Sequence, residues 1–150
     1  DLKRDKSKVE KDRYLGMTYF HQAKYDSSLF YLHKVEKVYS KIPAKAATLM
    51  PFIASAYFKK GDIVRAKKEL EEFYIIIKEN DLKNSDIILV NWNAYKIFNQ
   101  MGDNKKAKHC LENAYFEIKS KSKEIKNKDD KKLFMNTAMN KNIMEKWENS

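Results

Sequence analysis

The sequence is poor in the residues that break helices or form covalent cross-links. Among its 150 residues are three glycines, two prolines and one cysteine. The lone Cys110 excludes an internal disulfide framework, and because it stands at an apolar position beside Leu111, we expect a small buried side chain. So little glycine and proline argues against the turn-rich composition of a sandwich or barrel. With 35% charged residues, the composition predicts an all-α fold.

Long hydrophobic runs are missing as well. No run of about 18 apolar residues occurs, so we expect no transmembrane segment. No signal-peptide pattern is present, and a chain that opens with Asp1 is expected to be a fragment of a larger protein or a processed form. The localisation therefore stays open, with the cytoplasm favoured.

Residues that carry catalysis or bind metals occur without the spacing that such chemistry needs. The three histidines share no metal-ligand spacing, and the adjacent His109 and Cys110 side chains would diverge by about 100° on a helix. All three glycines belong to the repeat described below, which leaves none for a phosphate-binding loop. Glu69, Glu71 and Glu72 read as the solvated side of a helix. We therefore expect no metal, no cofactor and no enzymatic activity.

Arginine is scarce although the chain is strongly basic. The net charge is +10, yet only three of the 31 basic residues are arginine. Phosphates and base edges are most often held by the bidentate guanidinium group. Because twelve asparagines accompany the lysines, the lysine excess is as typical of a compositional bias as of a binding patch. We interpret it as a solvated surface, with electrostatic binding to nucleic acid or an anionic membrane through residues 119–132 as an alternative.

What the chain does contain is an internal repeat. Residues 57–62 and the apolar positions after them recur from residues 98–103 onward, and every matched pair is 41 residues apart. A weaker third copy lies 38 residues before the middle one. Self-similarity at such a period is typical of stacked helix–turn–helix units. We therefore predict helical hairpins with Gly61 and Gly102 at turns and Gly16 where two helices pack closely.

Apolar periodicity and turn residues predict the individual helices. Residues 63–77 carry apolar side chains at three- and four-residue steps, from Ile63 to Ile77, which indicates one buried face. Gly61 is expected to adopt a left-handed conformation and Asp62 to cap the next helix, while residues 84–86 form a further start signal. The expected helices span residues 8–23, 26–40, 46–60, 63–79 and 86–101, followed by a sixth that carries Ala107, Leu111, Ala114 and Ile118.

The two prolines are expected to mark helix boundaries. The residue before a proline is pushed out of the helical region, so Pro43 marks the exit from the second helix. Pro51 inside a helix would remove a hydrogen bond. The helix therefore either begins just before Pro51, with Thr48 as its cap, or bends there.

The end of the chain combines a charged stretch with an amphipathic one. Residues 119–132 have little apolar periodicity, which predicts either a solvated helical extension or a mobile connection. Apolar residues at four-residue steps from Met135 to Trp147 predict an amphipathic helix over residues 130–148. We expect this helix to cover the open edge of the repeat stack, with docking onto a partner or self-association as alternatives.

The pattern of small, aromatic and turn residues resembles the tetratricopeptide repeat. In that family an aromatic follows a small residue by three positions, a turn glycine follows by four more and an alanine by five more. Ala54, Tyr57, Gly61 and Ala66 match this pattern, and the resemblance covers roughly residues 9–119. The units exceed the family's usual length of about 34 residues. They are similar to longer units in the sensor and regulatory regions of bacterial signalling proteins.

The resemblance implies a right-handed stack of about three hairpins plus a C-terminal helix, forming one domain over residues 1–150. Its units would cover residues 8–43, 44–84 and 85–122. The sequence departs from the family pattern at Ala23, Ser28 and Tyr95. In the family the first helix of each pair lines a concave groove. The groove residues implied for this chain are Arg13, Met17, Phe20, His21, Phe58, Lys59, Trp92, Lys96 and Asn99.

These features predict a non-catalytic scaffold that binds a protein or peptide. The resemblance places it as a sensory, regulatory or interaction part of a larger bacterial protein. Electrostatic binding to nucleic acid or an anionic membrane is one alternative. A dimerisation module that uses residues 130–148 is the other.

Overall fold

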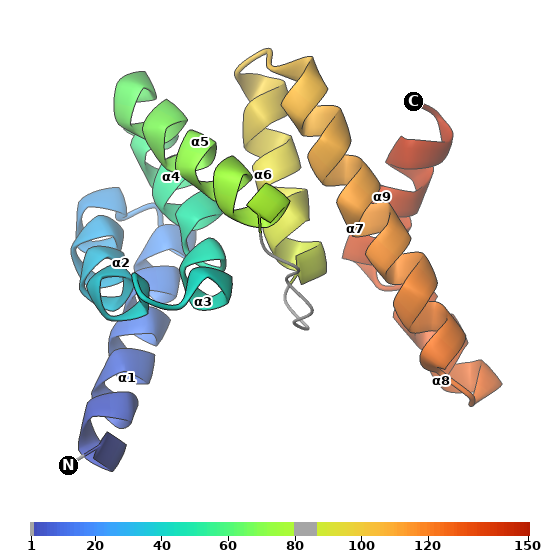
Figure 1. Ribbon diagram of the computed structural model, residues 1–150, viewed down its shortest axis with the longest axis horizontal. Helices are drawn as coiled ribbons and strands as arrows, with labels where there is room; N and C mark the ends of the chain where they lie inside the picture. Colours follow the sequence, from blue (N-terminus) through green and yellow to red (C-terminus); the bar gives the residue numbers. More distant parts are fainter. Residues whose placement is uncertain (1, 80–86) are drawn as a thin grey trace. The chain divides into compact units, whose positions relative to one another are not determined.

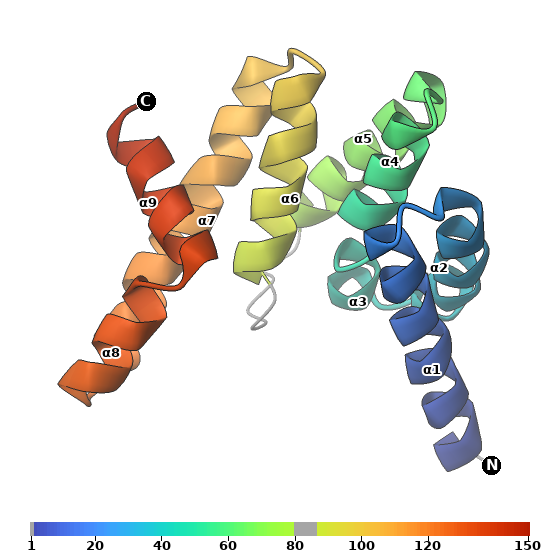
Figure 2. The same cartoon turned by 180° about the vertical axis from the view of Figure 1, so that it is seen from behind.

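The computed structural model describes residues 2–79 and 87–150, and within those ranges it contains helices and no strand (Figure 1, Figure 2). The all-α prediction is confirmed. The chain divides into two compact units, Asp1–Leu82 and Lys83–Ser150, so the single repeat domain stays a prediction. The start signal expected at residues 84–86 lies outside the described residues. Among those described, no helix is long and apolar enough to cross a membrane.

The first unit consists of two helical hairpins with a short helix between them. Helices α1 (Leu2–His21) and α2 (Tyr25–Tyr39) pack along one another, as do α4 (Met50–Lys59) and α5 (Ile63–Glu79). The short α3 (Pro43–Ala47) contacts α2, α4 and α5. The two hairpins join through α2, which packs on α4.

Close helix packing in the first unit depends on Gly16. A Cβ atom at this position would stand 2.7 Å from the Leu32 Cδ2 atom, nearer than real Cβ contacts come. The Ser28 hydroxyl donates to the Gly16 carbonyl oxygen at 2.8 Å, which satisfies a buried hydroxyl within the same contact. The predicted close helix contact at Gly16 is therefore confirmed. The buried apolar cluster of this unit is Leu29, Leu32, Val35, Tyr39, Ala46, Leu49, Phe52, Ile53 and Ala56.

The second unit is one hairpin covered by two shorter helices. Helix α6 (Ile87–Gln100) pairs with α7 (Asn104–Glu124), and α8 (Lys128–Met135) and α9 (Ala138–Glu148) both contact α7 (Figure 2). Cys110 is fully buried as expected, and burial raises the pKa of its thiol to about 12. The buried apolar cluster of this unit is Ile88, Leu111, Ala114, Ile118 and Ile143.

The turns within the hairpins share one backbone conformation. Gly61 and Gly102 have positive φ angles of 83° and 78°, and Ala23 adopts φ 57° in the matching turn of the first hairpin. The Asp62 and Asp103 carboxylates each accept a hydrogen bond at 3.1 Å from the backbone N–H three residues on. This is the N-cap geometry of α5 and α7. The predicted roles of Gly61 and Asp62 are confirmed.

The helix expected over residues 46–60 is divided between α3 and α4. Helix α4 begins at Met50, so Pro51 stands in its first turn, where the missing N–H breaks no helical hydrogen bond. The prediction of a helix start before Pro51 is confirmed. The expected cap at Thr48 is wrong, because the N-cap residue of α4 is Leu49 and the Thr48 hydroxyl donates instead to the Lys45 carbonyl at 2.7 Å.

The buried face of α5 is shorter than predicted. Ala66, Leu70 and Phe73 are fully buried, as the periodicity indicated. Ile63 is 39% exposed, because it is the first residue of the helix and precedes the turn that packs inward. Ile77, at the other end of the stripe, is only half-buried.

The terminal helix expected over residues 130–148 is also interrupted. Helix α8 ends at Met135, and the Thr137 hydroxyl accepts a hydrogen bond from the Asn140 N–H at 3.3 Å to cap α9. Residues 119–124 continue α7, so the alternative of a helical extension holds there. Helix α9 contacts α7 within the same chain, which agrees with the expected covering of a helical hairpin.

Candidate binding pocket in the second unit

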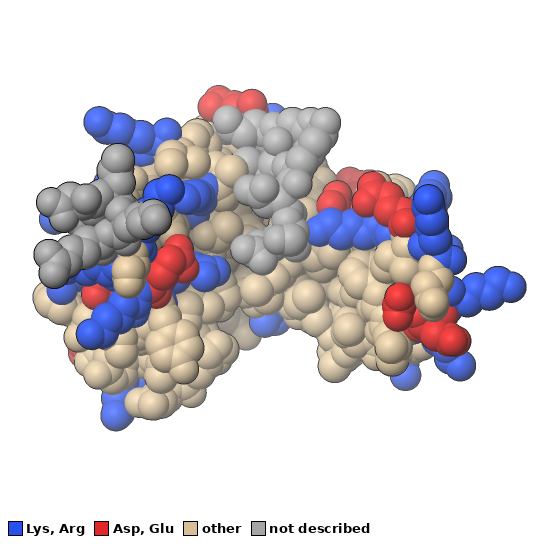
Figure 3. Space-filling view, turned by 90° about the horizontal axis from the view of Figure 1, so that it is seen from below, with Lys and Arg blue, Asp and Glu red and all other residues tan. Residues whose placement is uncertain are grey.

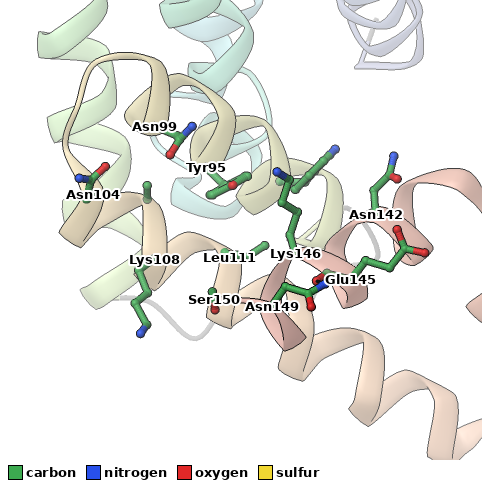
Figure 4. A pocket seen from close by; sticks show the side chains of 12 residues that line it. Tyr95, Asn99, Asn104, Lys108, Leu111, Asn142, Glu145, Lys146, Asn149 and Ser150 are labelled. Atoms are coloured by element: carbon green, nitrogen blue, oxygen red, sulfur yellow. Dashed lines mark hydrogen bonds between the residues drawn. The ribbon is translucent and has the colours of Figure 1, made fainter.

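A pocket of about 690 Å³ opens among α6, α7 and α9 (Figure 4). Its α6 wall carries Trp92 and Tyr95, whose rings stack with centroids 5.1 Å apart and an interplanar angle of 18°. The two rings are three residues apart, which places them on one side of the helix. Ala107 and Leu111 of α7 complete the apolar part. The pocket therefore offers a flat aromatic surface supported by the core of the unit.

Carboxamide side chains surround this apolar part. Asn99 comes from α6, Asn104 from α7, Asn142 from α9 and Asn149 from the residue after α9 (Figure 4). Within the described part of the chain, the side chains of Asn99, Asn104 and Asn142 make no hydrogen bond, whereas Asn149 donates to the Glu145 carbonyl at 2.7 Å. A carboxamide has donors and acceptors like those of a peptide group. Three of these amides are thus free to bind a ligand.

The charged groups at the pocket are mainly basic. Lys108 and Lys146 line it together with Glu145, and Glu145 is 3.9 Å from the ammonium of Lys141. The Lys96 ammonium lies 5.8 Å from the centroid of the Trp92 ring, and burial lowers the pKa of Lys96. Because the single carboxylate of the pocket has a cation beside it, the local field favours an acidic ligand.

Lysine and arginine side chains also lie away from this pocket. On the face in view in Figure 3 they are scattered, with aspartate and glutamate side chains among them. The stretch 119–132, which sequence analysis considered for anion binding, has exposed lysines, but Lys121 lies 3.7 Å from the Glu117 carboxylate.

Only some of the predicted groove residues meet at this pocket. Trp92 and Asn99 line it, and Lys96 lies beside Trp92. In the first unit Met17 and Phe20 are partly buried against its core, where their side chains serve packing. A groove that continues through both units stays a prediction. The predicted groove residues of the first unit are Arg13, Met17, Phe20, His21, Phe58 and Lys59.

The pocket also contains residues that sequence reasoning missed. Asn142, Glu145 and Lys146 belong to α9, which was expected only to cover the stack. Tyr95 departs from the family pattern, which has a small residue at this place. A large ring at that place was the one sequence signal that could have indicated the pocket.

A polar network in the first unit was missed as well. The imidazole Nδ1 of His33 donates to the Glu36 carboxylate at 2.7 Å, and the Tyr57 hydroxyl lies 2.8 Å from Nε2. The hydrogen bond to Glu36 raises the pKa of His33. Glu69 lies nearby with a buried carboxylate oxygen that has no hydrogen-bond partner in the described part of the chain.

Glu69 therefore corrects the view of residues 69–72 as a wholly solvated acidic cluster. Burial raises the pKa of Glu69 from its usual 4.5 to about 7, and the carboxylates of Glu36 and Glu72 act in the same direction. The sequence spacing places Glu69 next to Leu70 on α5, at the border of the buried face. Its burial, and its approach to Glu36 and His33 of α2, depend on tertiary packing.

Together these features define the chain as an all-α protein with a helical-repeat-like structure, whose described residues contain an aromatic and amide-lined pocket. Comparison with known proteins gives no match to a family model, to a curated protein or to a solved structure. No group of three or more histidine, cysteine, aspartate or glutamate side chains that could hold a metal ion occurs among the residues described.

Proposed function

We propose that this chain is a non-catalytic binding module that holds a polypeptide segment in the pocket of its second unit. The observation that carries the proposal is the stacked Trp92–Tyr95 pair beside three asparagine side chains that make no hydrogen bond in the described part of the chain. Aromatic rings provide apolar contact area at a small entropic cost, and carboxamides can pair with the main chain of an extended peptide.

The charge of the pocket indicates which peptide it would prefer. Lys108 and Lys146 extend from two different helices, and Lys96 adds a third ammonium near Trp92. A segment with an apolar anchor and flanking acidic residues would complement both features. We further propose that the hairpins belong to a tetratricopeptide-like, right-handed stack, and that the chain is a sensory or interaction part of a larger bacterial protein.

The test is a peptide array of apolar-anchored segments with acidic, neutral or basic flanks, followed by calorimetry on the peptides that bind. Replacing Trp92 with alanine should weaken binding by about 2 kcal/mol or more, which is typical of a central aromatic contact. Asn99→Ala should cost about 0.5–1.5 kcal/mol through lost hydrogen bonds. Circular dichroism checks that both variants keep their helices.

Matched controls separate the pocket from the rest of the surface. Asn93→Ala removes a carboxamide from α6 that does not line the pocket, and Tyr14→Ala removes an exposed ring from α1 in the first unit. Both variants should bind like the unmodified chain. Equal loss in Asn93→Ala and Asn99→Ala, or a preference for basic peptides, would contradict the proposal.

The observations favour this pocket over self-association through residues 130–148. Ile143 is fully buried, and the Trp147 ring lies 5.6 Å from that of Tyr115 on α7. The apolar stripe considered for a dimer is thus used to hold α9 against its own chain. Sedimentation of the chain with and without residues 130–150 remains the direct measurement.

A further inference from the structure

The α1–α2 hairpin has one side that packs on the rest of its unit and another that carries contiguous aromatic rings. On the packed side, His33 of α2 reaches Tyr57 of α4. On the other side, Tyr19 and Tyr31 stack with centroids 5.7 Å apart and an interplanar angle of 16°. Phe30 meets Tyr31 edge to face at 5.2 Å and is 58% exposed. The three rings form one patch, which we call the outer aromatic face.

Lysine side chains lie directly on this face. The Lys24 ammonium is 5.8 Å from the centroid of the Tyr19 ring. The Lys34 ammonium is 4.3 Å from the centroid of Phe30 and 5.2 Å from that of Tyr31. Among the residues that the structure describes, no carboxylate forms an ion pair with either lysine. Both cations are therefore available to an anionic partner.

A shallow groove extends the face along the hairpin. It has a volume of about 470 Å³ and shares Lys34 with the aromatic patch. Asp12 is the one carboxylate among its lining residues, against two lysines. The groove is lined by Lys8, Val9, Asp12, Lys34, Val35 and Val38.

The charge and the rings together identify the chemistry of the partner. A second copy of the chain would bring the same lysines against one another, so like charges oppose a symmetric dimer. An anionic lipid surface would pair with the lysines and take up exposed rings without stacking on their faces, and the vesicle arm of the test below separates it from nucleic acid. Nucleobases of any sequence can stack on aromatic rings. Flexible lysine side chains can contact the phosphates between those bases as point charges.

We propose that the outer aromatic face of the α1–α2 hairpin binds single-stranded nucleic acid. Bases stack on Phe30 and on the Tyr19–Tyr31 pair, and phosphates contact Lys24 and Lys34. The scarcity of arginine weighs against reading base edges, which needs the guanidinium fork. It does not weigh against stacking, which needs no such fork. The site belongs to the first unit, whereas residues 119–132, the stretch considered for electrostatic binding, belong to the second.

The test uses fluorescence anisotropy with a labelled oligothymidine of about 20 nucleotides, longer than the roughly 4–16 that one folded domain covers. The chain should bind it at low salt, and Phe30→Ala should weaken binding at least about fivefold. The double variant Lys24→Gln/Lys34→Gln should also lower the magnitude of the slope of log affinity against log salt by about 1.4, or about 0.7 per phosphate contact.

Control variants carry the same changes elsewhere. Phe116→Ala removes another exposed ring, and Lys67→Gln/Lys131→Gln removes two exposed charges from α5 and α8. Binding that Phe30→Ala weakens while Phe116→Ala does not supports the proposal. The proposal fails if the oligonucleotide does not bind at low salt or if Phe30→Ala binds normally. It also fails if a duplex of the same length binds equally well, or if binding is confined to vesicles with anionic lipid.

Discussion

At the scale of single residues, Glu69 places an ionisable carboxyl group in a partly desolvated site that disfavours its negative charge. It faces Glu36 and His33 from α2, and Glu72, Lys68 and Arg65 share α5 with it. The raised pKa means that the folded chain favours the protonated carboxyl. The stabilisation that protonated Glu69 gives the folded chain is fully present below its usual pKa of 4.5. It is lost as the pH rises through about 7.

We therefore expect Glu69→Gln to flatten the pH dependence of stability. Glutamine keeps the size of the side chain and cannot ionise, so the variant should lose less stability than the unmodified chain between pH 4.5 and about 7. The raised pKa of His33 adds a loss in the same direction in both proteins. Urea denaturation at several pH values measures the difference.

The control for this prediction is Glu148→Gln, which removes an exposed carboxylate at the end of α9. It should follow the pH dependence of the unmodified chain. If Glu69→Gln instead lost stability more steeply as the pH rose, the desolvated position of Glu69 would be refuted.

At Ala23 the residue departs from the family pattern, but the backbone has the turn conformation that this pattern implies. Its φ of 57° lies in the left-handed region that Gly61 and Gly102 occupy in the other turns. An L-residue there costs about 1–2 kcal/mol, so the turn forms in spite of its residue and because the packed helices require it. The sequence alone, which lacks glycine at this place, gave no local reason to expect the same turn.

At the scale of helices, the main differences from expectation are breaks. Both the 46–60 and the 130–148 segments contain two helices where periodicity indicated one. The apolar periodicity of a sequence can continue across a short break between two helices when both helices pack on the same neighbouring helix. Periodicity alone therefore cannot locate the break. Capping residues carry that information, and the two threonines differ in whether they cap.

Thr137 and Thr48 therefore provide a matched pair of substitutions. Thr137→Ala removes the N-cap of α9 and should lower the free energy of unfolding by about 1 kcal/mol. Thr48→Ala removes a hydroxyl that bonds back to the Lys45 carbonyl and caps no helix, so its effect should be smaller. Chemical denaturation of both variants measures the difference. A larger effect of Thr48→Ala than of Thr137→Ala would contradict the assignment of Thr137 as a capping residue and Thr48 as a non-capping one.

At the scale of the whole molecule, each unit has an apolar core of its own. Ile143 is buried in the core of the second unit and Leu70 is buried in the first. Truncating a buried leucine or isoleucine to alanine costs about 2–5 kcal/mol, which is a large part of the stability of a small domain. The cost should fall mainly on the unit that contains the residue.

Hydrogen exchange resolved by segment tests this separation. Ile143→Ala should speed exchange across α6 to α9 and leave α1 to α5 nearly unchanged, while Leu70→Ala should do the reverse. If either substitution accelerates exchange equally throughout, the chain unfolds as one cooperative body and the separation is wrong.

The sequence by itself determined the features that depend on near neighbours along the chain. The left-handed glycines 61 and 102, the caps Asp62 and Asp103, and the small residue at Gly16 follow from backbone geometry and helix periodicity, which act over a few residues. Trp92 and Asn99, which line the pocket, are among the predicted groove residues because their position within a repeat indicates which side of a helix they occupy.

Only the tertiary structure decided which side chains from different helices meet. Asn142 and Lys146 join Trp92 because α9 folds back onto α7, and the packing of the first unit desolvates Glu69 and brings it near Glu36 and His33 of α2. Contacts of this kind join residues far apart in the sequence, and burial and charge at such places depend on the packed arrangement. The repeat therefore determined that hairpins form, and the packing of those hairpins determined where a ligand can bind.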